Sequence, residues 1–241
     1  MKRLFDILAA TIGLLMALPL LTIVCFLVWR QDRRSPFYLA PRVGKDGRTF
    51  TMVKVRSMRV GAATSGVDST AANDQRITPI GRFVRRYKID EIVQLWNVVK
   101  GEMSLVGPRP NVHRDVALYT EIERRLLTVR PGMTDLASIV FADEGEILKG
   151  HSDPDLRYHQ VIRPWKSRLG LFYIEHRSFL LDLQLIYLTV VAIISRRTAL
   201  FGVQRLLEAL GADTLLTHVA ARDTTLTPYP PPGAADIVLS R

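Results

Sequence analysis

The hydrophobic pattern of the chain is dominated by its N-terminus. Residues 7–29 contain no charged side chain, and this run of 23 exceeds the roughly 20 apolar residues that a helix needs to cross a membrane. Pro19 lies near the middle of the run, where proline removes a helical hydrogen bond and forces a kink. Both flanks of the run are basic, with Lys2 and Arg3 before it and Arg30, Arg33 and Arg34 after it.

Three interpretations of this segment compete. A cleaved signal peptide needs a shorter apolar region and a small-residue cleavage site, and none follows Trp29. A straight spanning helix leaves one basic flank on the side of the membrane that positive charge avoids. A helix broken at Pro19 has two arms of roughly 15–18 Å, about half the ~30 Å hydrocarbon core, so it can enter and leave through one face. We expect this re-entrant hairpin over residues 1–34, with Pro19 in a structural role and the spanning helix as its main competitor.

The rest of the chain predicts short elements. The expected elements are a turn at 44–47, a strand at 49–55, a loop at 60–75 and helices at 89–100, 111–129 and 201–210. In the helix 89–100 the apolar face holds Ile89, Ile92, Val93, Trp96 and Val99, and the opposite stripe holds Asp90, Gln94 and Asn97. Gly101 is expected to end this helix.

A second apolar stretch, 185–194, is too short to span a membrane, so we interpret it as an interfacial or core helix. The predicted fold class is therefore α/β, mostly helical with a small β element. It combines the N-terminal membrane hairpin with a folded domain over 35–211 that carries interfacial amphipathic helices. The proline-rich end, 212–241, is expected to be a disordered tail.

Charge and composition narrow the possibilities. Lys and Arg number 33 and Asp and Glu 23, a net charge of +10, yet 48% of the residues are hydrophobic. A disordered basic protein would be less apolar and a polytopic transporter more so. Residues 30–59 carry nine basic side chains against two acidic ones, which is typical of a juxtamembrane patch that contacts anionic lipid heads. The single cysteine, Cys25, excludes an intrachain disulfide and a multi-cysteine metal site.

Two groups of residues are candidates for chemistry. Asp90 and Glu91 follow a basic segment (Arg82, Arg85, Arg86 and Lys88) that favours their ionised forms. An ionised Asp90 could be a nucleophile or a Mg²⁺ ligand, or it could simply cap the helix that starts there. Lys54, Arg56 and Arg109 are candidate phosphate ligands, and Arg109 stands between two prolines that hold its turn rigid. The alternative for Arg109 is an exposed turn residue.

Other chemistries find no support. The chain has no P-loop, dinucleotide fingerprint or Ser-His-Asp signature, and its five histidines lack metal-ligand spacing. The acidic cluster Asp143, Glu144 and Glu146 is interpreted as a solvated face or a set of ion-pair partners. Nucleic-acid binding is not expected, because the basic residues form no recognised motif and few aromatic residues lie among them.

Several ordered segments carry a resemblance to a known family. They are Lys54–Met58, Arg76–Arg86, Asp90-Glu91, Gln94–Val98, Gly101–Pro110 and Pro131–Thr134, with Tyr173, Ser178 and Asp182 further on. Together they resemble the bacterial sugar transferases, and more closely the monotopic phosphoglycosyl transferases that start polysaccharide and glycoconjugate assembly. The resemblance covers roughly residues 2–195.

The resemblance implies a reaction and a location. A sugar 1-phosphate would pass from a UDP-sugar to polyprenyl (undecaprenyl) phosphate with release of UMP, at the cytoplasmic face of the bacterial inner membrane. By family analogy Asp90 would be the nucleophile, forming a phosphosugar–Asp intermediate, and would bind Mg²⁺. Glu91 would assist by accepting a proton. Arg85 and Pro110, which lie in the matching segments, are grouped with Lys54, Arg56 and Arg109 as substrate-binding residues.

The chain departs from the family pattern at four positions. Val93 replaces a usual proline, Glu102 a usual aspartate, Leu18 a frequent serine before Pro19, and Asp135 a frequent glycine. None of these removes a proposed catalytic group. The missing hydroxyl at Leu18 bears on how the helix bends, and Asp135 bears on the choice of sugar. The alternative function is a non-enzymatic adaptor that binds lipid heads through its basic surface.

Overall fold

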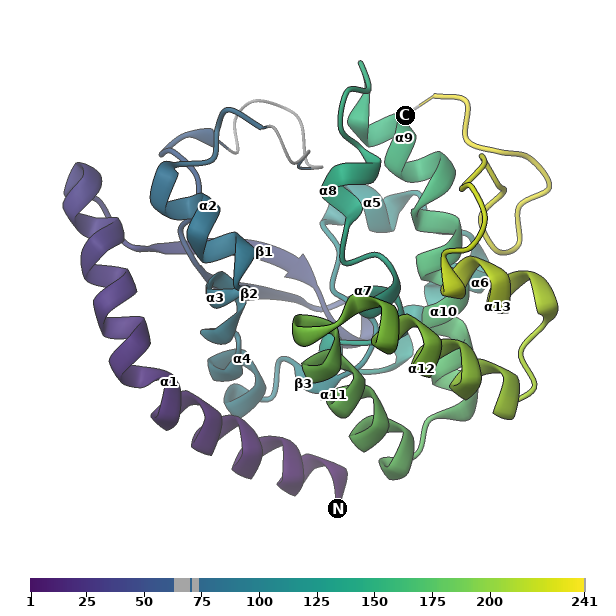
Figure 1. Ribbon diagram of the computed structural model, residues 1–241, viewed down its shortest axis with the longest axis horizontal. Helices are drawn as coiled ribbons and strands as arrows, with labels where there is room; N and C mark the ends of the chain where they lie inside the picture. Colours follow the sequence, from purple (N-terminus) through teal and green to yellow (C-terminus); the bar gives the residue numbers. More distant parts are fainter. Residues whose placement is uncertain (63–69, 71–73, 241) are drawn as a thin grey trace.

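The computed structural model describes residues 1–62, 70 and 74–240 (Figure 1). The first element, α1 (Lys2–Asp32), is one continuous helix that contains Pro19. Its axis changes direction near the middle, so α1 is bent rather than folded back on itself (Figure 1). The hydroxyl of Thr22 donates to the carbonyl of Leu18 over 2.8 Å, and such bonds to the preceding turn favour helix bending. A hydroxyl therefore supports the bend, three positions after Pro19.

α1 lies along one side of the molecule (Figure 1), and most of its large apolar side chains are exposed. It is long and apolar enough to cross a membrane, and only 17% of its most apolar window is buried. The buried minority packs inward: Ala10 joins a cluster with α4, and Leu21, Val24 and Val28 pack against residues of β2, α2 and α3. A helix that served as a soluble core would be covered on more sides.

A β-hairpin lies beside α1. β1 (Phe37–Val43) pairs antiparallel with β2 (Thr49–Val55), with Ala40 opposite Met52. The 3₁₀ turn η1 (Lys45–Gly47) joins them, and the left-handed backbone of Asp46 and Gly47 allows the chain to reverse. The predicted strand 49–55 and the preceding turn are confirmed. Most of the predicted loop at 60–75 lies outside the described residues.

The predicted helix 89–100 is instead two helices, α3 (Ile89–Ile92) and α4 (Leu95–Lys100), preceded by α2 (Pro79–Arg86). Tight i→i−3 bonds separate α3 from α4 although no proline is present, with the amide of Gln94 donating to the carbonyl of Glu91 over 2.9 Å. The predicted end at Gly101, with φ of 91°, is confirmed.

The polar stripe of this segment faces the interior of the protein, whereas the sequence pattern predicts that the apolar face does. Asp90, Gln94 and Asn97 are buried, whereas Trp96 is 49% exposed. Of these polar groups, Asn97 is accommodated because β2 offers it backbone partners. The amide of Asn97 donates to the carbonyl of Thr51 over 2.7 Å and its oxygen accepts from the Val53 amide over 3.0 Å. Asn97 thereby ties α4 to the hairpin.

A second, parallel pair of strands carries the next segment. β3 (Ser104–Val106) pairs with β4 (Gly132–Thr134). Between them run α5 (His113–Ala117), α6 (Glu121–Arg124) and the 3₁₀ turn η3 (Arg125–Thr128), so the predicted helix 111–129 is broken into pieces. The break at Thr120 follows from its capping box with Glu123, which starts a new helix there.

The larger core lies in the helical half. Its helices are α7 (Leu136–Val140), α8 (Glu144–Ile147), α9 (Pro154–Val161), α10 (Arg163–His176), α11 (Phe179–Ile194), α12 (Arg196–Ala209) and α13 (Thr214–Ala221). α11 contains the apolar stretch 185–194 and is buried along one face, at Leu181, Leu185 and Leu188, while Tyr187 and Ile193 on other faces are exposed. The predicted helix 201–210 lies within α12.

The expected disordered tail at 212–241 is wrong for the described residues. Its first part forms α13, and the rest follows the surface of α9 and α10. The ring of Tyr229 lies 4.5 Å from that of Trp165, and Arg168 lies over both rings and donates to the carbonyl of Pro230 over 2.9 Å. Prolines reduce the entropy that this segment loses on docking, so a proline-rich composition did not mean disorder here.

Candidate functional site

Three segments distant in sequence meet around Glu91. Lys54 comes from the end of β2, Asp90 and Glu91 from α3, and Arg109 from the turn after β3. The Lys54 Nζ lies 3.1 Å from Glu91 Oε1, and Arg109 Nη1 donates to Glu91 Oε2 over 3.1 Å while its Nη2 donates to Oε1. Three of the candidate site residues, Lys54, Glu91 and Arg109, thus form a partly buried ion-pair cluster.

Glu91 is the hub of this cluster. Burial alone would raise the pKa of its carboxyl, but the charges of Arg109 and Lys54 outweigh burial and hold that pKa well below its ordinary value. The same pair raises the pKa of Arg109. Burial lowers the pKa of Lys54 and the Glu91 charge opposes that shift. Glu91 is therefore a permanent anion that orients two cations, and a weak base.

The carboxylate of Asp90 lies in a different environment from that of Glu91. The Asp90 side chain is buried, and its Oδ1 has no hydrogen-bond partner among the described residues. Burial raises the pKa of the Asp90 carboxyl, and the neighbouring charge of Glu91 raises it further, while Lys54, Arg85 and Lys88 act against that rise. A buried carboxylate oxygen without a partner costs stability, and Asp90 is therefore the carboxylate of this pair that still has an oxygen to offer to an incoming group.

The Arg109 turn is held by close backbone packing. The Gly107 amide donates to the carbonyl of Thr134 and the Gly132 amide to that of Pro108, each over 3.0 Å. A Cβ on Gly132 would come within 2.1 Å of the Gly107 nitrogen, so only glycine allows the two segments to approach this closely. Pro110 restricts the turn further. These contacts preorganise the Arg109 guanidinium.

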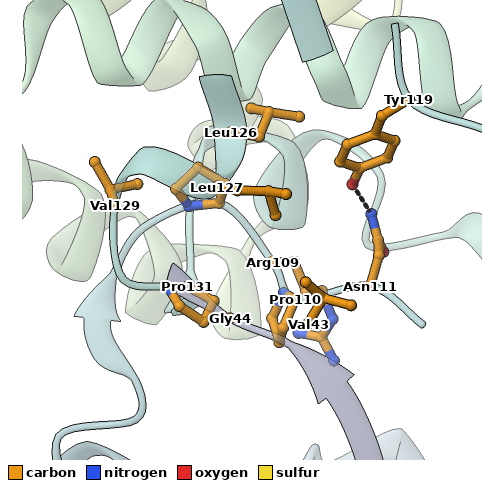
Figure 2. A pocket seen from close by; sticks show the side chains of 11 residues that line it. Val43, Gly44, Arg109, Pro110, Asn111, Tyr119, Leu126, Leu127, Val129 and Pro131 are labelled. Carbon is orange, nitrogen blue, oxygen red and sulfur yellow. Dashed lines mark hydrogen bonds between the residues drawn. The ribbon is translucent and has the colours of Figure 1, made fainter. Parts of the chain in front are cut away.

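Behind this turn lies a small, mainly apolar hollow (Figure 2). In Figure 2 Asn111 points toward Tyr119, and its amide donates to the Tyr119 hydroxyl over 2.6 Å. The carbonyl of Asn111 also accepts from the Val43 amide over 2.9 Å. Burial raises the pKa of Tyr119 to about 12, so its hydroxyl stays protonated. Asn111 therefore connects the turn to β1 and to α5–α6.

Arg56 does not join the cluster. Its guanidinium pairs bidentately with Asp32, with both distances 2.7 Å, and its Nε donates to the carbonyl of Ser35 over 2.8 Å. Arg56 follows the last residue of β2, and Asp32 ends α1, so the pair fastens the end of the long helix to the hairpin. The structure thus shows Arg56 anchoring α1 to the hairpin, and its contact with substrate stays a prediction.

Arg85 lies in the last turn of α2, and its charge acts on Asp90. The connection between α2 and α3 is short and passes through Lys88, whose backbone is left-handed. Arg85 thus belongs to the electrostatic surroundings of Asp90, and its contact with substrate stays a prediction.

Sequence reasoning missed the acidic groups on the other side of Arg109. Asp135 and Glu144 act on the charge of Arg109, and Glu144 pairs with Lys166. Asp135 also caps α7, accepting from the Ser138 amide over 2.7 Å, and burial raises the pKa of its carboxyl. The available signal was Asp135 in place of the family's glycine. The predicted ion-pair role of the cluster 143–146 is confirmed at Asp143, which contacts Arg196 and Arg222.

The residues around Asp90 suit a magnesium ion that also uses substrate oxygens. Within the described ranges, no group of three or more acidic, histidine or cysteine side chains is placed to bind a metal ion by itself. Mg²⁺ is commonly bound by one or two carboxylates together with substrate phosphates. The unpartnered Asp90 Oδ1 supplies one such oxygen, whereas both Glu91 oxygens are occupied by Arg109 and Lys54.

Comparison with known proteins identifies the family of the chain. The family model for bacterial sugar transferases matches residues 1–196. The chain is 33% identical over 211 residues to the UDP-galactose-lipid carrier transferase of Erwinia amylovora, covering 81% of this chain and 41% of that one. It is 37% identical to the undecaprenyl-phosphate glucose phosphotransferase of Komagataeibacter xylinus, covering 82% and 36%, and 34% identical to the exopolysaccharide production protein PSS of Rhizobium leguminosarum bv. phaseoli, covering 81% and 96%.

The family match, together with the long apolar N-terminal helix, defines the class of protein as a membrane-associated sugar transferase. The chain belongs to the bacterial sugar transferase family, because the family match covers far more than half of it. It spans about two fifths of the length of the first two relatives named above and nearly all of the third. The predicted family and the predicted enzyme class are therefore confirmed.

Proposed function

We propose that this protein transfers a sugar 1-phosphate from a UDP-sugar to polyprenyl (undecaprenyl) phosphate, releasing UMP and starting the synthesis of an exopolysaccharide or glycoconjugate. An Asp90 oxygen attacks the phosphorus next to the sugar, the bond from that phosphorus to the bridging oxygen breaks, and UMP leaves. A phosphate oxygen of the lipid then attacks the same phosphorus and breaks its bond to Asp90. The product is a polyprenyl diphosphate sugar.

The observation that carries this proposal is the contrast between Asp90 and Glu91. A nucleophile needs an oxygen that is free to attack, and Asp90 has one that is buried and unpartnered among the described residues. Glu91 has both oxygens engaged by cations. The names of the relatives support the substrates, since one mentions a UDP-sugar and another undecaprenyl phosphate.

The cations have a clear task in this reaction. Both substrates are polyanions and repel the attacking carboxylate, so positive groups placed beforehand lower the barrier. Arg109 and Lys54 are held in place by Glu91, and the charge of Arg85 acts on Asp90. We assign Glu91 to positioning these cations rather than to accepting a proton, because its depressed pKa makes it a poor base.

Magnesium fits the same site as a proposed cofactor. Asp90 would hold it together with diphosphate oxygens of the donor, and the ion would neutralise the charge that develops on the leaving UMP. Chain residues provide the remaining interactions: Lys54 and Arg109 bind phosphate oxygens, and the rigid Gly107–Pro110 turn keeps Arg109 in register.

The proposed location is the cytoplasmic face of the bacterial inner membrane. The bent α1 exposes apolar side chains along both of its halves, and both of its ends carry basic residues. A helix bent at Pro19 can dip into one leaflet and return, which keeps both basic ends on the same side. The active site would then lie at the headgroup plane, where the phosphate of the lipid substrate is found.

A screen of UDP-sugars tests the proposal. The purified full chain, in detergent with Mg²⁺ and undecaprenyl phosphate, is expected to release UMP with at least one UDP-sugar, and Asp90→Asn is expected to release none above background. Glu146→Gln, which removes an exposed carboxylate from a surface pair, is the matched control and should keep the parent rate. If no UDP-sugar gives UMP while the protein still binds vesicles, the adaptor function replaces the enzyme proposed here.

A further inference from the structure

A cavity of about 400 Å³ lies on a part of the molecule that the reaction does not use. It is bounded by the start of α1, the end of β3, the segment after η3 and the turn between α10 and α11. Lys54, Asp90, Glu91 and Arg109 do not line it. The cavity is therefore separate from the site around Asp90.

The lining of this cavity is strongly basic. Its positive side chains are Lys2, Arg3, Lys45, Arg130 and Arg177. Its two carboxylates are already satisfied within the protein. Asp182 pairs with Lys2 and accepts from the Tyr173 hydroxyl over 2.6 Å, and Asp6 accepts from the Ser104 hydroxyl over 2.8 Å.

Four of these cations have no carboxylate partner within the described part of the chain. Arg3 and Arg130 use one guanidinium nitrogen each on a backbone carbonyl, of Val99 and Gly101 respectively. The Nη1 of Arg3 is buried and has no hydrogen-bond partner among the described residues. Lys45 and Arg177 make no ion pair with any described residue. Within the described chain, one buried donor without a partner, together with three exposed cations without carboxylate partners around the same cavity, suits an anion.

The surroundings indicate the source of that anion. The first turns of α1 and α11 border the cavity, and their rings touch, with Phe5 and Phe179 5.3 Å apart in an edge-to-face arrangement. Next to them Leu4, Leu8 and Leu180 are each more than half exposed. The N-terminus of α1 lies directly beside α11 in Figure 1. A basic cavity continuous with exposed apolar side chains matches a molecule with an anionic head and apolar chains.

We propose that this cavity binds the phosphodiester headgroup of an anionic phospholipid, with its acyl chains along the exposed residues of α1 and α11. Arg130 and Arg177 contact the phosphate oxygens from the outer side, and Arg3 donates through its free Nη1 from the inner side. The bound lipid holds the start of α1 against α11 and so sets the depth of the protein in the membrane. This site is distinct from that of the polyprenyl phosphate substrate.

Native mass spectrometry of the full chain, released from nanodiscs of equal parts phosphatidylglycerol and phosphatidylcholine, tests the proposal. The parent is expected to retain one phosphatidylglycerol in preference to phosphatidylcholine. The double variant Arg130→Gln/Arg177→Gln is expected to lower that retention roughly tenfold or more, since each basic residue near a lipid head contributes about a kcal/mol. Arg177→Gln alone, an exposed surface change, should lower it in part, and thermal melts check that each variant is folded.

The matched control is Arg197→Gln/Arg205→Gln, which removes the same charge from exposed positions of α12. It is expected to retain the lipid like the parent. Equal loss of the lipid in the control would mean that general surface charge, and not this cavity, retains it. Retention of phosphatidylglycerol by both double variants, or equal retention of phosphatidylcholine by the parent, would overturn the site. A phosphate adduct in buffered inorganic phosphate with no retained lipid would assign the cavity to a free anion instead. UMP release is a separate readout, so failure here leaves the proposed reaction standing.

Discussion

At the scale of single residues, adjacent carboxylates have opposite properties because their neighbours differ. Glu91 is stabilised as an anion by Arg109 and Lys54, whereas Asp90 is buried with one oxygen unpartnered within the described chain. Ionised Asp90 therefore costs stability at neutral pH, since its pKa is raised in the folded protein relative to the unfolded chain. The cost is present above the folded pKa and disappears as the pH falls through that value toward the ordinary pKa of aspartate.

Asp90→Asn should therefore abolish turnover and raise the melting temperature. The isosteric amide removes the buried charge, and for a chain of this size each kcal/mol corresponds to a shift of about 2–4 °C. Scanning calorimetry at pH 7 measures the change. The gain should shrink as the pH approaches the ordinary pKa of aspartate. A lower melting temperature at pH 7 would contradict the placement of an uncompensated charge at Asp90.

Glu91→Gln should slow the reaction by about a hundredfold, the cost of misplacing a catalytic cation by roughly an ångström. Activity should fall at acidic pH as the Asp90 carboxylate is protonated. Because Glu91 is not the titrating group, this fall should remain in Glu91→Gln. The pH profile of UMP release from pH 5 to 8 distinguishes these roles. Loss of the acidic limb in Glu91→Gln would show that Glu91 is the base after all.

At the scale of elements, ion pairs and polar side chains fasten α1 and α4 to the hairpin. Arg56 and Asp32 join the end of α1 to the residue after β2, and Asn97 joins α4 to β2. These contacts position the elements that carry Lys54 and Asp90. They explain how Asn97, on a short helix, can face inward, because backbone groups of β2 bind its amide.

Arg56→Gln should lower the melting temperature and leave the KM for the UDP-sugar within about twofold, because Arg56 anchors α1 and does not reach the Glu91 cluster. Asp32→Asn should have a similar effect, and the double variant should lose less than the sum of the two. Thermal melts and donor titrations measure both quantities. A large rise in KM without a change in melting temperature would return Arg56 to the substrate site.

The sequence allowed the strand 49–55 and the long apolar N-terminal segment to be predicted from local patterns, and it marked Asp90, Glu91 and Arg109 as candidates without showing that Glu91 and Arg109 pair. It did not reveal that α3 and α4 are separate, since the tight turn at Val93-Gln94 has no proline or glycine to mark it. Nor did it reveal the partner of Arg56, because the Asp32 contact joins two elements that only the tertiary fold brings together. The docked tail depends in the same way on Trp165 and Arg168, far away in sequence.

At the scale of the whole molecule, the two features that dominate composition occupy different places. Apolar side chains cover α1 and one face of α11, while the basic residues surround the Asp90 site and the cavity near the N-terminus. In the membrane arrangement proposed above, the bent helix lies in one leaflet and both basic groups lie at the headgroup plane. The apolar helices and the separate basic regions together account for a chain that is both basic and apolar.

Both ends of α1 should be accessible from the same side of the membrane. In a Cys25→Ser background, one cysteine is placed in an N-terminal tag and another at Arg34→Cys, an exposed position. An impermeant maleimide should label both in inside-out vesicles and neither in right-side-out vesicles. Labelling of the two sites from opposite sides would establish a spanning helix and contradict the re-entrant arrangement.

The most direct test of the central claim is the mass of the protein after it is mixed with its UDP-sugar and Mg²⁺ in the absence of polyprenyl phosphate. The account predicts one sugar phosphate covalently bound per chain, located on the peptide that contains Asp90, with stoichiometric release of UMP. Addition of polyprenyl phosphate should remove the adduct, and Asp90→Asn should never acquire it. An Asp90→Asn protein that releases UMP as fast as the parent would contradict the role given to Asp90.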